Sequence, residues 1–188
     1  MITDRERLVD VDLARQGDRQ AFGRLVDGYG GLVHTLLLRM VRDHDTALDL
    51  AQETFVKAWT RLRSLRKPAS FPSWLCSTAR RTALDHLRRT RARKEVSMPE
   101  EALADARWEP ETGLSAEGME LLEQAVCRLS QRDRQLLTLA YWGELGLSEV
   151  GRIMGIPEPS VRVYLHRARK RLREQLKGHE DELLQQIG

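Results

Sequence analysis

The fold of this 188-residue chain is decided by residues 148–172, which read SEVGRIMGIPEPSVRVYLHRARKRL. A short helix is predicted over 148–154, followed by a turn at 155–157 and a longer helix after it. Pro159 is tolerated in the first turn of the longer helix, because that position needs no amide donor. A supporting helix, a glycine turn and a basic helix together predict a helix-turn-helix, whose second helix enters the major groove of DNA.

The longer helix is amphipathic. At about 100° per residue, an apolar stripe of Val161, Leu165, Ala168 and Leu172 lies opposite a basic face. Arginines on that face can donate to guanine edges or phosphates, and Val163 is either a thymine-methyl contact or an ordinary exposed valine. The candidate DNA contacts are Ser160, Arg162, Val163, His166, Arg167 and Lys170.

Helical periodicity runs through nearly the whole chain, and strand-like alternation is missing. The remaining helices are expected over about 19–40, 46–65, 72–89, 116–129 and 131–141. Pro99, Pro110 and Gly113 indicate a linker, and Asp43 can cap the helix that follows it. We therefore predict an all-α protein with two small helical domains, 1–93 and 116–188, joined by an acidic flexible linker over 94–115.

The charges fall in three blocks, although the net charge is only +3. Residues 61–94 are strongly basic, 95–126 acidic and 152–177 basic again. This order favours two surfaces that bind a polyanion, joined by a segment that avoids it. The competing explanation is solvated helix surface.

Several classes of function are disfavoured. Two cysteines, Cys76 and Cys127, make neither a disulfide framework nor a zinc site. The sequence shows neither a signal peptide nor an apolar run near the ~18 residues of a membrane span, so we expect a cytoplasmic protein without membrane insertion. The cluster at 43–45, Asp-His-Asp, is better explained by capping than by metal binding, and we expect no catalytic residue, metal or cofactor.

Two helices of the N-terminal half carry unusual outward faces. Over 72–89, Trp74 is expected to face outward among arginines, where it could stack on an exposed base or else pack under the loop 66–71. Over 46–65, Leu50 is expected to face outward beside acids, as a docking patch or as scatter.

The chain resembles the extracytoplasmic-function (ECF) sigma factors of RNA polymerase, in the sigma-70 family. Their second conserved region is similar to GDRQAF (17–22), DLAQETFVKAW (49–59), FPSWL (71–75) and DHLRR (85–89). Their fourth region is similar to LSQRDR (129–134), LSEV (147–150) and VRVYLHRARKRL (161–172). Two positions depart from the family pattern: Arg81 stands where relatives often carry asparagine, and Gly151 where alanine is usual.

The resemblance implies core RNA polymerase, promoter DNA and an anti-sigma protein as partners. The helix around 49–59 would dock on the clamp of the polymerase through Asp49, Leu50, Gln52, Glu53 and Lys57. The −10 element would be bound, and held single-stranded, by Lys67, Ser70, Trp74, Ser77, Thr78, Arg81, Asp85, Arg88 and Arg89. The helix-turn-helix would read the −35 element, and the acidic linker would occupy the RNA exit path. The alternative is a stand-alone helix-turn-helix regulator, which would bind duplex DNA without polymerase.

Overall fold

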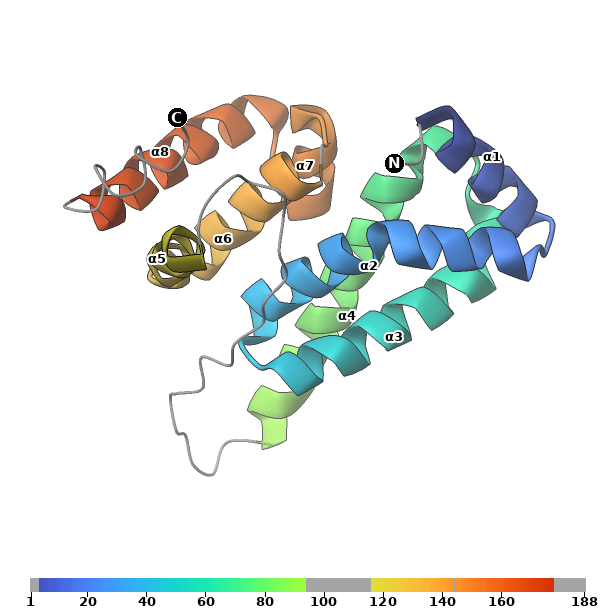
Figure 1. Cartoon of the computed structure of the whole chain (residues 1–188), viewed down its shortest axis with the longest axis horizontal. Helices are drawn as coiled ribbons and strands as arrows, with labels where there is room; N and C mark the ends of the chain where they lie inside the picture. The colour runs from blue at the N-terminus through green and yellow to red at the C-terminus, as the bar shows by residue number, and fades with distance from the viewer. Residues whose placement is uncertain (1–3, 94–115, 144, 178–188) are drawn as a thin grey trace. The chain divides into compact units, whose positions relative to one another are not determined.

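The computed structural model describes residues 4–93, 116–143 and 145–177, and within these ranges it contains helices only (Figure 1). The chain divides into two compact units, one on each side of residue 106. The all-α prediction with two helical units is therefore confirmed. The predicted linker over 94–115 lies outside the described residues.

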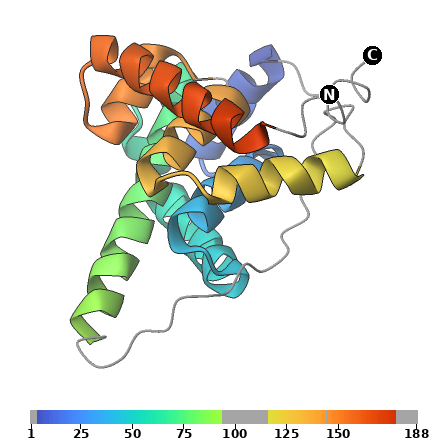
Figure 2. The ribbon, with the colours of Figure 1, turned by 90° about the vertical axis from the view of Figure 1, so that its left-hand side faces the viewer.

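Over residues 4–93, the N-terminal unit consists of four α-helices that are arranged around α2. Both α3 and α1 pack on α2, and α4 packs on α2 and α3. Large side chains such as Leu25, Leu36, Phe71 and Leu75 are fully buried between them. The C-terminal turns of α4 extend past the ends of α2 and α3 (Figures 1 and 2). The bounds are α1 Asp4–Arg15, α2 Arg19–Val41, α3 His44–Arg61 and α4 Phe71–Arg93, with 3₁₀ turns η1 Leu62–Ser64 and η2 Pro68–Ser70 before α4.

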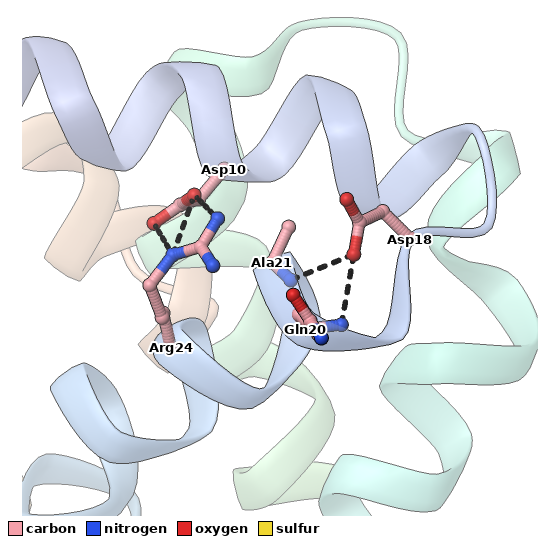
Figure 3. A network of polar contacts seen from close by, with 5 residues as sticks. All are labelled: Asp10, Asp18, Gln20, Ala21 and Arg24. Atoms are coloured by element: carbon pink, nitrogen blue, oxygen red, sulfur yellow. Dashed lines mark hydrogen bonds and ion pairs between the residues drawn. The ribbon is translucent and has the colours of Figure 1, made fainter.

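The corner between α1 and α2 is held by two polar contacts (Figure 3). Asp18 caps α2 by accepting from the amides of Gln20 and Ala21, at 2.8 and 3.0 Å. The Nε of Arg24 donates to both carboxylate oxygens of Asp10, at 3.0 and 3.1 Å. The sequence analysis predicted no helix over α1, because its buried side includes this carboxylate, which a pattern of apolar residues does not detect.

The acid–histidine cluster at 43–45 lies at the start of α3 and caps this helix. Asp43 is the N-cap residue, and its carboxylate accepts from the amide of Thr46 at 2.8 Å. Hydrogen bonding from the Thr46 side chain, followed by that from the Thr46 amide, lowers the pKa of Asp43, because both favour the charged carboxylate. The prediction that the cluster serves as a helix cap is confirmed.

The C-terminal unit contains the predicted helix-turn-helix. α7 (Leu147–Met154) is followed by Gly155, whose φ of +69° is the left-handed conformation that glycine adopts at no steric cost. One difference lies upstream: the helix expected over 131–141 is α-helical only to Leu137 and continues as a π-helical turn. The bounds are α5 Ala116–Cys127, α6 Gln131–Leu137, the π turn η3 Thr138–Trp142, α7 Leu147–Met154 and α8 Glu158–Leu176.

Gly151 lets α7 approach the turn closely. A Cβ built on this residue would lie 2.7 Å from the carbonyl oxygen of Ile156 and 3.3 Å from Cγ2 of Val161. The first neighbour is backbone and cannot rotate away. This close approach offsets the poor helix propensity of glycine, which is up to ~1 kcal/mol less favourable than alanine.

We predict that Gly151→Ala destabilises the C-terminal unit by about 1–3 kcal/mol, because overpacking outweighs the gain in helix propensity of at most ~1 kcal/mol. The matched control is Gly28→Ala in α2, where a Cβ meets nothing within 4 Å. That change should be neutral or stabilising. Amide hydrogen exchange in α7 and α8 checks the prediction, and slower exchange in Gly151→Ala would contradict it.

Candidate nucleic-acid interfaces

The face of α8 opposite its core contacts is basic and exposed. Val161, Leu165 and Ala168 are buried, as the wheel predicted. On the opposite side of α8, five of the six residues predicted to contact DNA are exposed: Arg162, Val163, His166, Arg167 and Lys170. The sixth, Ser160, lies near the start of the helix and is partly buried. Glu158 is the acid nearest to Arg162, with 4.0 Å between their charged atoms, so the guanidinium is hardly neutralised.

Val163 stands in the middle of this basic face. Its side chain is 47% exposed, and the residues flanking it on the wheel, Arg167 and Lys170, are exposed cations. An aliphatic group surrounded by hydrogen-bond donors is suited to a thymine methyl in the major groove. That contact remains a prediction.

The second basic surface lies on α4. Arg81, Arg88 and Arg89 are exposed, while Asp85 is partly exposed and lies 3.4 Å from Arg88. Such a contact between exposed groups is weak, so the Arg88 side chain can exchange its partner for a phosphate. The last turns of α4, which include the exposed Arg88 and Arg89, extend beyond α2 and α3.

The hydroxyls of α4 are turned toward their own helix. Ser77 Oγ donates to the carbonyl of Ser73 at 2.8 Å, and Thr78 Oγ1 donates to that of Trp74 at 2.9 Å. Both side chains are partly buried. Their oxygens can still accept from an exocyclic base amine, but their protons are committed.

Trp74 is less exposed than expected. Its side chain is partly buried, and its ring centroid lies 6.1 Å from that of the fully buried Phe71. The alternative from the sequence analysis, packing against the end of the loop over 66–71, describes this contact. In the same loop, Lys67 is exposed and Ser70 ends the 3₁₀ turn η2.

The surface of α3 corrects one prediction. Leu50 was expected to face outward, and this is wrong, since it is only 4% exposed. The physical reason is that α3 packs on both α2 and α4, so its buried arc is wider than a single stripe. Lys57, at the α4 edge of that arc, donates to the buried Thr82 at 3.1 Å and pairs with Glu53 at 2.6 Å.

The exposed face of α3 carries two apolar residues that the sequence analysis did not assign to it. Leu48 is 41% exposed and Val56 is 63% exposed, and both share an arc of the wheel with the exposed Asp49 and Gln52. The signal was available, since these four residues recur at helical spacing. An arc of acidic, amide and aliphatic groups on one face is suited to a protein partner.

Two groups of features are missing from the described ranges. Within 4–93, 116–143 and 145–177, no helix is long and apolar enough to cross a membrane. The same residues bring together no three histidine, cysteine or acidic side chains able to hold a metal ion.

Each of the two units contains a segment that matches the model of a known protein family. Residues 25–93 match the family model "Sigma-70 region 2", and residues 119–172 match "Sigma-70, region 4". The chain is 29% identical to the ECF RNA polymerase sigma factor SigW of Bacillus subtilis over 177 residues, covering 89% of this chain and 95% of SigW. It is 31% identical to the RNA polymerase sigma-H factor of Pseudomonas aeruginosa, covering 90% and 93%.

Among solved structures, the fold is similar to the sigma factor RpoE of Bartonella quintana, crystallised with the anti-sigma factor NepR. The TM-score is 0.67 at 21% identity, covering 84% of this chain and 97% of that one. Both conserved regions are present in the family's order, and the similarity to full-length relatives extends over nearly the whole chain. The chain therefore belongs to the ECF family of RNA polymerase sigma factors.

Proposed function

We propose that this protein is an alternative sigma subunit that engages one promoter through the basic faces of α4 and α8 while α3 docks on core RNA polymerase. The observation that carries the proposal is the exposure of two cationic helix faces in two separately folded units. DNA presents phosphates continuously, so two such faces on one chain can bind two sites of the same duplex.

The −10 site is assigned to α4 and the loop before it. Arg81, Arg88 and Arg89 would hold phosphates of the non-template strand, with Lys67 contributing from the loop. Trp74, partly exposed beside Phe71, would stack on one unpaired base. Holding an unstacked base offsets the few kcal/mol that its exposure costs, and this favours the open promoter.

The −35 site is assigned to α8. Arg162, Val163 and Arg167 lie where the N-terminal half of a recognition helix meets base edges, and Lys170 lies where the backbone is nearer. Ser160, at the start of the helix, would contact a phosphate. His166 completes the same exposed face.

Control of the protein is assigned to an anti-sigma partner. The sigma factor RpoE, whose fold this chain shares, was crystallised with such a protein. A factor of this kind works beside the polymerase in the cytoplasm. The proposal assigns no catalytic residue or cofactor to the chain, and the acidic segment over 94–115 would occupy the RNA exit path.

The first test is binding to core polymerase. We expect the protein to co-purify with core RNA polymerase and to start transcription at a cognate promoter. Asp49→Lys should weaken that binding, because it reverses a charge on the exposed arc of α3. Asp27→Lys, which changes another exposed acid, on α2, is the control and should bind normally. If the unmodified protein fails to bind core and instead binds duplex DNA alone, a stand-alone regulator is the correct description.

The second test separates melting from docking. Trp74→Ala and Arg88→Ala should reduce the permanganate reactivity of unpaired thymines at the −10 element severalfold, while core binding stays within about twofold of the parent. The control is Arg19→Ala, an exposed arginine on α2. Normal melting in both variants would remove α4 from the proposal.

The third test concerns the duplex site. Arg162→Ala and Arg167→Ala should each cost about 1–3 kcal/mol of binding at promoters that depend on a −35 element, if they contact bases. Arg128→Ala, an exposed arginine between α5 and α6, serves as the control. Footprints with unchanged −35 protection in both variants would refute the assignment.

A further inference from the structure

One arginine in the basic run of α8, Arg171, is exposed but already has a partner within the C-terminal unit. At about 100° per residue, Arg171 falls beside Tyr164 and Ala168 and away from Lys170. Ala168 is fully buried and Tyr164 is partly buried, whereas Lys170 and Arg171 are both exposed. Arg171 therefore lies at the edge of the side of α8 that faces α6.

The Arg171 side chain is 54% exposed, but its guanidinium is paired with a carboxylate of the same unit. Its Nη1 donates to Oδ2 of Asp133 at 2.8 Å, and the Asp133 side chain is only 6% exposed. Asp133 lies in the first turn of α6, where the hydroxyl of Ser130 accepts from its amide at 3.2 Å. A carboxylate that is nearly buried requires a charged partner, so the pair holds the two helices in register.

A second contact joins the same two helices. The guanidinium carbon of Arg132 lies 3.8 Å from the centroid of the Tyr164 ring, which is a cation–π contact. Arg132 and Asp133 are neighbours on α6, while Tyr164 and Arg171 are about two turns apart on α8. Contacts at two heights along α8 restrict both its tilt and its roll.

The roll of α8, its rotation about its own axis, is important because hydrogen bonds to base edges require precise positions of donor and acceptor. With an outer helix radius of about 5–6 Å, a roll of 20° moves a side chain on the opposite face by about 2 Å. A hydrogen bond to a base edge does not survive a displacement of that size.

We propose that Asp133 and Arg171 are positioning residues for DNA readout: their ion pair sets the roll of α8, and Arg171 is not one of the phosphate contacts. The inference rests on the proposed function, in which the exposed face of α8 binds the −35 duplex. It also distinguishes Arg171 from the other cations of residues 167–173, a segment with five cations in seven residues.

The test is binding of the reconstituted holoenzyme to a −35 promoter duplex over a range of salt concentrations. Asp133→Asn removes a negative charge close to DNA, and electrostatics alone would therefore strengthen binding. If Asp133 positions α8, the substitution has the opposite effect, and we expect the affinity for DNA to fall about three- to tenfold. The control acid is Glu158, exposed at the start of α8, and Glu158→Gln should leave binding unchanged or tighter.

Salt dependence separates positioning from phosphate contact. Arg171→Gln should lose affinity with an unchanged slope of log K against log salt, whereas Lys170→Ala should reduce that slope by about 1. The double variant of Asp133→Asn and Arg171→Gln should bind no more weakly than the weaker single variant, because both changes break one pair.

Three results would overturn the inference: Asp133→Asn binding as tightly as the parent, Arg171→Gln reducing the salt slope as Lys170→Ala does, or additive losses in the double variant. Circular dichroism verifies that each variant is folded. If Asp133→Asn is not folded, the salt dependence of DNA binding measured for Arg171→Gln tests the inference. If the unmodified holoenzyme does not bind the −35 duplex, the proposed function itself fails.

Discussion

Burial of one side of an amphipathic helix is the constraint on which the two candidate interfaces depend. In α8, the stripe of Val161, Leu165 and Ala168 is buried, and the helix period then sends the cations between these positions to the opposite side. Guanidinium groups are not buried beside this apolar stripe unless they have partners, because desolvating an unpaired charge is too costly. The same logic applies to α4, where Leu75 and Ala79 are buried and the arginines near the C-terminal end of the helix reach solvent.

The parts that the sequence predicted correctly are those decided locally. Helix, glycine turn and helix follow from a few residues, of which Gly155 is the most informative because it adopts a positive φ. The orientation of Leu50 depended instead on how many helices surround α3, which periodicity within one helix cannot reveal. Helix α1 was missed for a related reason, since its inner side is completed by an ion pair between Asp10 and Arg24.

Sequence patterns also fail to identify cations whose side chains join two helices. Lys57 reads as a surface lysine, yet it donates to the buried Thr82 of a neighbouring helix. Arg171 reads as one of several DNA-binding arginines, yet it pairs with a nearly buried carboxylate. Charge counts therefore indicate which helices carry cations but do not show which cations already have partners within the protein. Among the described residues, whether a cation is paired within the protein can be read only from its contacts in the structure.

The central claim is that the basic faces of α4 and α8 contact one promoter at two separate places. It is tested most directly with a DNA-cleaving iron chelate tethered through cysteine in the holoenzyme, at Val163→Cys or at Arg81→Cys. Cys127 is replaced by alanine in both proteins, and Cys76 is fully buried and so protected from labelling. The account predicts cuts around the −35 element from position 163 and around the −10 element from position 81. Cuts at the same place from both positions, or no promoter-specific cuts from either, would contradict it.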